Sequence, residues 1–268
     1  MANFGDAFGA GAQVIGYEPV GSDTDRRFRA NGVKSCDAVG VRPKPALASI
    51  GMSIRIRRAT DSDLDLLTWV MLAASRSHLE RGIWEYMNAS GEAASLAFLR
   101  RLATTDTVHL FHHSLFLVAE LDGEPGAAMC AYDSSTEGFD VALPEIAAAT
   151  AAEGIDAEDP EYARRSGVLL SGFVMGDPGP PGPRWVIENV ATRPEMRRKG
   201  LVDGLLHQLL GHGRERGFEH AQISVFIENE RARRAYIKAG FEPLTEQRSD
   251  GWQRELGCPG TEMLLQPL

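Results

Sequence analysis

A strand–helix–strand–helix pattern between residues 185 and 240 constrains the fold more than any other part of the sequence. WVIENVAT (185–192) and HAQISVFI (220–227) are typical of strands. GLVDGLLHQLLGHGRERG (200–217) and NERARRAYIKAG (229–240) are typical of amphipathic helices. Alternating strands and helices imply a layered α/β fold.

The flanking regions predict further elements of both kinds. SIRIRRA (53–59) alternates like a strand, and Thr60 or Asp61 is suited to cap the helix that follows. Two apolar runs around Asp122-Gly123 predict a β-hairpin. Helices are predicted over GEAASLAFLRRLATT, LPEIAAATAAEG and DPEYARRSGVLL, a loop over DPGPPGPR, and closing strands over FEPLTEQRS and TEMLLQPL.

Residues 1–52 differ in character from the rest of the chain. They are rich in Gly, Ala, Asp and Arg and keep neither a helical nor a strand period for long. We interpret them as a disordered N-terminal extension; the alternative is a short element that docks on the domain. From residue 53 onward the pattern becomes regular, so one domain is predicted over 53–268.

Composition excludes several classes of partner. The net charge of −9 argues against nucleic acid, which needs a broad basic surface. No apolar run approaches the roughly 18 residues of a membrane span, so no membrane is expected. Cys36, Cys130 and Cys258 are widely spaced and odd in number, which predicts neither a disulfide framework nor a metal site. This cysteine usage favours a cytoplasmic location.

The segment RPEMRRKG (193–200) joins the central strand to the helix that follows. Backbone N–H groups in the first turn of a helix lack intrahelical partners and lie at the positive end of its dipole. Gly200 leaves this backbone open, and Arg197, Arg198 and Lys199 add charge. The segment therefore predicts a diphosphate site, the alternative being an ordinary helix start with solvated cations. No Gly-Lys-Ser/Thr follows, which argues against a P-loop.

Two motifs in this order resemble the GNAT superfamily of acetyl-CoA-dependent N-acetyltransferases. The first is Arg197-Arg198-Lys199-Gly200-Leu201-Val202, which is similar to the family's Arg/Gln-x-x-Gly-x-Gly/Ala. The second runs from Asn229 through Tyr236 to Gly240-Phe241 and is similar to Asn-x(6)-Tyr-x(3)-Gly-Phe. The resemblance covers about residues 53–268, with an insertion at about 134–183. It implies a mixed, mostly antiparallel central sheet with helices on both faces.

The resemblance also implies where acetyl-CoA binds as co-substrate. The pantetheine arm would pair with the backbone of Val190, Ala191 and Thr192, whose amides would also polarise the thioester carbonyl. The diphosphate would rest on the amides from Arg198 to Asp203, close to Arg197. Val202 stands where the family has Gly or Ala, and its side chain can crowd the pyrophosphate. Gly204 can relax that helical turn.

The same resemblance gives candidate catalytic residues. Tyr236 would protonate the departing thiolate, the alternative being a packing role. Asn229 would contact the pantetheine or cap its helix, or do both. Some relatives carry a Glu base on the fifth strand, but the matching residue here is Ser224. Glu188 is the next candidate base or cation anchor, expected on the same strand face as Val190; a salt bridge to an Arg is the alternative.

The sequence leaves the acceptor open. Aromatic candidates for its pocket are Trp69, His78, Trp84 and Tyr86, although core packing is the commoner use of such residues. His112-His113 predicts an exposed turn rather than a metal site, because no third ligand is apparent. The function expected is N-acetyl transfer to a small-molecule or peptide primary amine, with a homodimer left open. The alternative is a non-catalytic acyl-CoA-binding sensor or scaffold.

Overall fold

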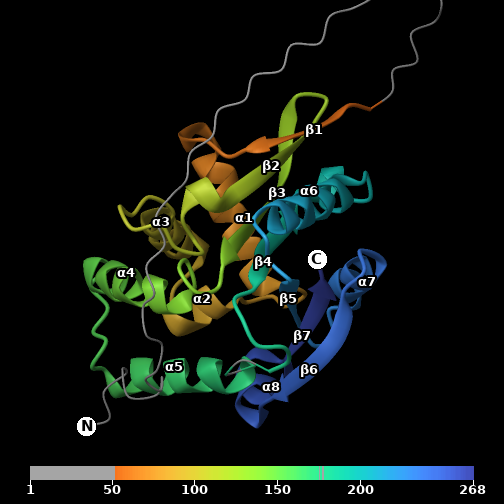
Figure 1. Cartoon of the computed structure of the whole chain (residues 1–268). Helices are drawn as coiled ribbons and strands as arrows, with labels where there is room; N and C mark the ends of the chain where they lie inside the picture. The colour runs from red at the N-terminus through yellow and green to blue at the C-terminus, as the bar shows by residue number, and fades with distance from the viewer. Residues whose placement is uncertain (1–51, 175, 177) are drawn as a thin grey trace, which may run out of the picture. The chain divides into compact units, whose positions relative to one another are not determined.

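The computed structural model describes residues 52–174, 176 and 178–268, so the predicted N-terminal extension lies outside the described residues except for Met52. The strands of this part form one sheet in the order β1-β2-β3-β4-β5-β7-β6 (Figure 1). The strands are β1 Ile54–Arg58, β2 Phe116–Leu121, β3 Glu124–Asp133, β4 Trp185–Thr192, β5 His220–Phe226, β6 Glu242–Arg248 and β7 Gly260–Pro267. The helices are α1 Leu64–Arg76, α2 Ile83–Met87, α3 Glu92–Ala103, α4 Phe139–Ala152, α5 Pro160–Gly172, α6 Leu201–Glu215, α7 Glu230–Lys238 and α8 Asp250–Leu256.

Strand direction and helix placement confirm the predicted fold class. Neighbouring strands run antiparallel except for β4 and β5, which are parallel and are connected through α6. Helices α1, α3 and α4 pack on one face of the sheet, where Leu67, Phe98 and Ile146 join one buried cluster. Helices α6 and α7 pack on the other face, where Leu205 and Tyr236 join a second cluster (Figure 1).

The β2–β3 hairpin confirms its sequence signal. Asp122 and Gly123 both have positive φ, 53° and 89°, as a two-residue type I′ turn requires. The turn places Gly126 of β3 beside the segment that leads into α6. A Cβ on Gly126 would lie 1.9 Å from the sulfur of Met196, so any larger residue would have to displace the Met196 side chain.

Two short helices, α2 and α8, were missed by the sequence analysis because each is too short to establish a helical period. Helix α8 carries Trp252, which is fully buried and donates from its indole N–H to the Leu169 carbonyl of α5 at 2.9 Å. Gly172 lies against the Trp252 ring, where a Cβ would be 2.2 Å from the nearest ring atom. Helices α2, α5 and α8 therefore share a third buried cluster, which includes Tyr86 and Cys258.

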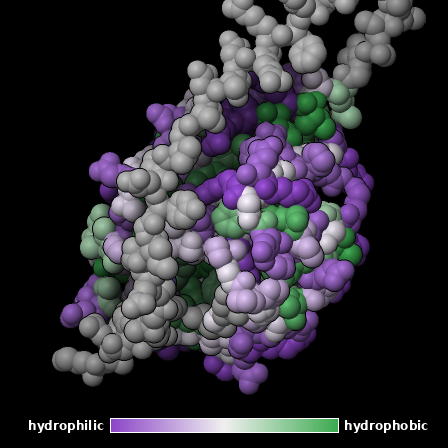
Figure 2. Space-filling view, in the orientation of Figure 1, coloured by the Kyte–Doolittle hydropathy of each residue, from purple (hydrophilic) through white to green (hydrophobic). Residues whose placement is uncertain are grey.

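The face seen in Figure 2 is mostly hydrophilic, with small hydrophobic groups between polar ones. The large apolar side chains that are exposed are scattered over separate elements: Met52, Ile54, Val108, Phe139, Ile237 and Leu244. No helix in the described ranges combines the length and apolarity needed to cross a bilayer.

The expectation of an exposed turn at His112-His113 is wrong for His112. Its side chain is buried, and its Nδ1 lies 2.7 Å from the Ser114 hydroxyl. Burial also lowers the pKa of His112. His113 is partly buried and bonds to the Ala103 carbonyl at the end of α3 at 2.8 Å, and the His112 ring lies 4.4 Å from the His113 ring, centre to centre.

Candidate functional site

The site is built where β4 and β5 stop pairing. The parallel pairing covers Trp185 to Ile187 of β4 and ends opposite Ile223 of β5. Beyond Ile187, β4 still pairs with β3, while β5 pairs with β7. On the side that faces β5, the backbone N–H and C=O groups of residues 188–192 therefore form no hydrogen bonds with another strand of the described sheet.

A β-bulge in β4 marks the start of this opening. Cys130 of β3 pairs with Glu188, whereas Ala128 pairs with Ala191, so two β4 residues lie opposite Met129. Asn189, one of these two, has a φ of 52°. Its side-chain amide lies 3.5 Å from the Cys130 sulfur, which in turn donates to the Glu188 carbonyl at 3.3 Å.

The bulge corrects one sequence-based prediction. Strict alternation would place Glu188 and Val190 on one face of the strand. Instead, Val190 packs with the α6 cluster, while the Glu188 carboxyl faces Tyr132 on the α1 side. The extra residue at Asn189 reverses the alternation, so Glu188 lies on the opposite face from Val190.

The segment between β4 and α6 is anchored on the hairpin. The Arg193 amide donates to the Gly126 carbonyl at 2.8 Å, and Met196 lies over Gly126. The Arg197 guanidinium lies 3.3 Å from the Thr192 carbonyl. These contacts fix the direction in which α6 starts, close to the end of β4.

Gly200 is the N-cap of α6, with φ 86° and ψ 2°. This left-handed conformation favours glycine, and a Cβ there would have no neighbour closer than 3.7 Å. Gly204, one turn further along α6, lies against β1. A Cβ on it would come within 2.9 Å of Ile56, so Gly204 allows α6 to lie close to β1.

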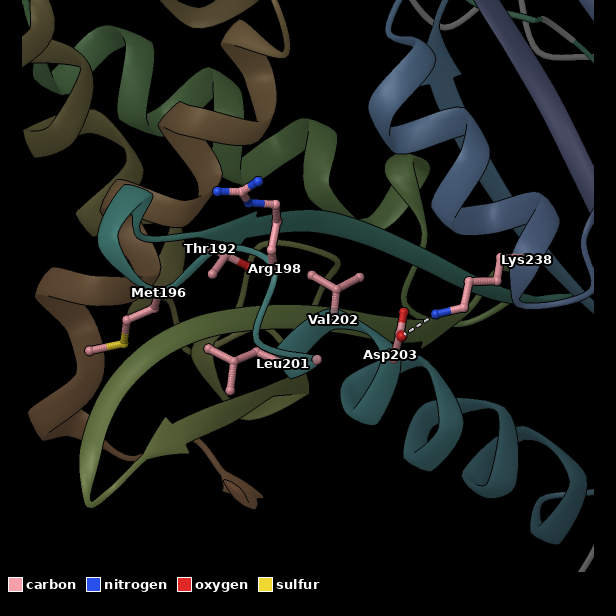
Figure 3. A pocket seen from close by; sticks show the side chains of 8 residues that line it. Thr192, Met196, Arg198, Leu201, Val202, Asp203 and Lys238 are labelled. Carbon is pink, nitrogen blue, oxygen red and sulfur yellow. Dashed lines mark hydrogen bonds and ion pairs between the residues drawn. The ribbon is translucent and has the colours of Figure 1, made fainter. Parts of the chain in front are cut away.

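A cavity of about 260 Å³ lies at this helix start (Figure 3). It is lined by Thr192, Met196, Arg198, Gly200, Leu201, Val202, Asp203 and Lys238. The Thr192 hydroxyl is buried and has no hydrogen-bond partner among the described residues. Leu201 is buried in the α6 cluster, whereas Val202 is only partly buried and borders the cavity.

The structure brings together most of the predicted diphosphate residues but not all of them. Of the basic run, Arg198 lines the cavity, while Arg197 and Lys199 lie outside its lining. Lys238, which the sequence analysis missed, enters from α7 and pairs with Asp203 at 2.5 Å (Figure 3). Met196 was also missed. Lys238 lies two residues after Tyr236, but nothing in the local pattern indicates a partner on α6.

Glu188 has an unusual environment for a carboxylate. Its residue is partly buried, and no basic side chain pairs with it in the described part of the chain. Burial raises the pKa of Glu188 from about 4.5 to about 7, partly opposed by a hydrogen bond from the Tyr132 hydroxyl. The described residues therefore give no support to the salt-bridge alternative, and a carboxyl with this pKa can exchange a proton near neutral pH.

Tyr236 is the buried residue of α7 and belongs to the α6 cluster, with its ring 6.5 Å from that of Phe241 in an edge-to-face arrangement. Its hydroxyl has no hydrogen-bond partner among the described residues. Burial raises the pKa of Tyr236 above its usual range, so the hydroxyl remains protonated at neutral pH.

Asn229 caps α7, which confirms the capping role that was one of the two predicted for it. Its side-chain oxygen accepts from the Ala232 amide at 3.2 Å, and its side-chain nitrogen donates to the Ser77 hydroxyl at 2.7 Å. Ser77 ends α1 with a φ of 57°, a conformation that costs a non-glycine residue free energy. The hydrogen bond thus joins α1 to α7. The role of Asn229 toward a cofactor stays a prediction.

The aromatic candidates lie in different environments. Trp84 and Tyr86 are buried, Trp84 in the α1 cluster and Tyr86 in the α2–α5–α8 cluster. Trp69 borders a shallow groove between α1 and α3, where the Arg193 guanidinium lies 4.9 Å from the centre of its ring. His78 is exposed just after α1.

Residues 136–241 match the family described as acetyltransferase (GNAT) family. The match begins inside the segment predicted as an insertion and ends at Phe241 of the second sequence motif. No curated protein gives a significant match.

Two solved structures that superpose on this chain are named as acetyltransferases. One acetyltransferase superposes with a TM-score of 0.55 at 16% identity, covering 80% of this chain and 98% of its own. An N-acetyltransferase from Staphylococcus aureus Mu50 superposes with a TM-score of 0.53 at 18% identity, covering 79% and 99%. At such identities the likeness establishes the fold.

The raised pKa of Glu188 predicts a stability effect with a definite sign. Folding binds a proton to this carboxyl between pH 4.5 and about 7, so its contribution to the unfolding free energy falls as pH rises through this window. Glu188→Gln, which carries no charge, should be more stable than the wild type above pH 7, by on the order of 2 kcal/mol, and nearly equal near pH 4.5.

Urea denaturation at pH 5 and pH 8 measures this difference. Glu215→Gln, at the exposed end of α6, is the control and should show the same difference from the wild type at both pH values. A Glu188→Gln variant that is less stable than the wild type at pH 8 would contradict the assignment of a desolvated carboxyl.

Proposed function

We propose that the chain, whose residues 136–241 match the acetyltransferase (GNAT) family, is an acyltransferase that transfers an acetyl group from acetyl-CoA to a primary amine. The observation that carries the proposal is the β4–β5 opening, which leads directly to the exposed N-terminus of α6. A thioester arm and a diphosphate need these two surfaces in this order. The acceptor we propose is a small-molecule or peptide amine.

The donor fits the residues at the opening. The free edge of residues 188–192 suits the amide-containing pantetheine arm, which would pair with the backbone of Val190, Ala191 and Thr192. The amides from Arg198 to Asp203 would hold the diphosphate at the positive end of the α6 dipole. The unpartnered Thr192 hydroxyl supports a polar ligand in the cavity. Acetyl-CoA supplies the activated acetyl group, which the chain orients.

Glu188 would remove the proton from the attacking amine. An alkylammonium has a pKa of roughly 10, so the amine must lose a proton for its nitrogen to attack. A carboxylate with a pKa of about 7 is a stronger base than an ordinary glutamate and is still largely ionised slightly above neutral pH. The carboxyl lies at the start of the β4 edge, on the α1 side of the sheet.

Tyr236 would donate to the departing sulfur. Its raised pKa keeps the hydroxyl protonated, and no described residue competes for the hydroxyl hydrogen. A phenol with such a pKa is a weaker acid than a thiol, whose pKa is about 8.5. The hydroxyl therefore acts by donating a hydrogen bond to the negative charge that develops on sulfur as the bond to carbon breaks.

The diphosphate site predicts a large effect at Gly200. Gly200→Asp puts a carboxylate beside the α6 amides and should weaken CoA binding by at least about tenfold, or about 1.4 kcal/mol. Gly217→Asp is a matched control, because Gly217 also has a positive φ, 81° against 86°, and open space around it, but lies beyond the other end of α6. Calorimetry with CoA measures both variants. Equal affinities for the two would exclude the helix start as the diphosphate site.

Variants of Tyr236 and Glu188 should change the rate in different ways. The rate is measured as thiol release from acetyl-CoA in the presence of an accepted amine. Tyr236→Phe keeps the ring and should lower kcat by about 10²- to 10⁴-fold, with KM for acetyl-CoA within a few-fold. Glu188→Gln should lower kcat/KM and abolish the rise in rate centred near pH 7.

If the Tyr236→Phe variant turned over at the wild-type rate, the role of Tyr236 would be limited to packing. Cofactor binding without thiol release across a broad amine panel would favour a sensor or scaffold.

A further inference from the structure

Helix α7 is attached across the β4–β5 opening at both of its ends. At its N-terminus, Asn229 donates to Ser77 of α1 at 2.7 Å. At its C-terminus, Lys238 bonds to Asp203 in the first turn of α6 at 2.5 Å. Only the second contact borders the cavity at the α6 N-terminus, so any ligand that enters this cavity meets a lysine that already has an anionic partner.

The Lys238–Asp203 pair is exposed to solvent. The side chain of Lys238 is 71% exposed and that of Asp203 is 53% exposed. Ion pairs this accessible contribute little net stability, because water competes for both charges and both side chains lose rotamer freedom. Lys238 can therefore change partners at low cost, and its long flexible side chain reaches several positions at the cavity mouth.

Asp203 occupies the place where an anionic ligand would bind. It is an acidic residue in the first turn of α6, where a carboxylate interacts favourably with the helix dipole. Its side chain points toward Lys238 (Figure 3). A diphosphate at the same helix start would be repelled by this carboxylate and attracted by the lysine.

We propose that Asp203 and the diphosphate of the donor compete for Lys238, so that Lys238 is a phosphate ligand which Asp203 holds in place in the free protein. The inference rests on the proposed function and adds a specific exchange of partners to it. When the donor enters, the ammonium leaves the carboxylate and binds phosphate oxygens. Asp203 thereby lowers the affinity for the donor, and Lys238 raises it.

This competition predicts effects of opposite sign for the two partners. Asp203→Asn removes the competing charge and should tighten CoA binding by about threefold or more. Lys238→Met removes the phosphate ligand and should weaken CoA binding by about fivefold or more. In the Lys238→Met background, Asp203→Asn should improve CoA binding less than it does in the wild type, because it then relieves only the repulsion from the carboxylate and releases no lysine. Calorimetry at fixed ionic strength measures each dissociation constant.

Two controls isolate the diphosphate and the position. Pantetheine lacks the diphosphate, and its affinity should be equal in all of these variants. Arg234 and Glu230 form another exposed pair on α7, 3.8 Å apart and outside the cavity lining. Arg234→Met and Glu230→Gln change the charge of the same helix and should leave the CoA dissociation constant within a factor of about two.

The sign of the Asp203→Asn effect decides between the possible outcomes. Weaker CoA binding in both Asp203→Asn and Lys238→Met would mean that the pair only supports the structure, which overturns the proposal. Unchanged binding in both variants would also overturn it. In either case normal CoA binding by the wild type leaves the proposed function standing, whereas a wild type that does not bind CoA overturns both.

Discussion

The early end of hydrogen bonding between β4 and β5 is the constraint on which the site depends. A fully paired sheet would have no free edge in its centre, because each strand would satisfy the backbone groups of the next. Here pairing stops after Ile187, and the bulge at Asn189 changes which residues of β4 face each helix layer. The open edge therefore leaves backbone polar groups free, and the bulge turns Val190 to the α6 side while Glu188 stays on the α1 side.

The rest of the molecule holds this opening in shape. The hairpin fixes the segment before α6 through Gly126, so that the helix begins at the end of the open strand edge. Across the gap, α7 is joined to α1 by Asn229 and to α6 by Lys238. The cost of the arrangement is visible in two places: a desolvated carboxyl at Glu188 and a left-handed backbone at Ser77. Both unfavourable features persist because the helices packed on either face of the sheet hold Glu188 and Ser77 in these positions.

Sequence reasoning predicted the layered fold and the helix start at Gly200, because periodicity and capping signals are local and strong over residues 185–240. It placed Glu188 and Val190 on the same face, since a bulge has no dependable sequence signature and strict alternation was assumed. It missed Lys238 because an ion pair between distant helices leaves no local pattern. It also missed α8, whose seven residues are held by the burial of Trp252 rather than by a helical repeat.

Amide hydrogen exchange with and without acetyl-CoA tests the central claim most directly, since the claim concerns particular backbone groups. If the donor pairs with the open edge of β4 and rests on the start of α6, exchange should slow at the free amides within residues 188–192 and 198–203. Amides in the paired part of β4, Trp185 to Ile187, should change little. Binding of acetyl-CoA that leaves exchange in both segments unchanged would contradict the account.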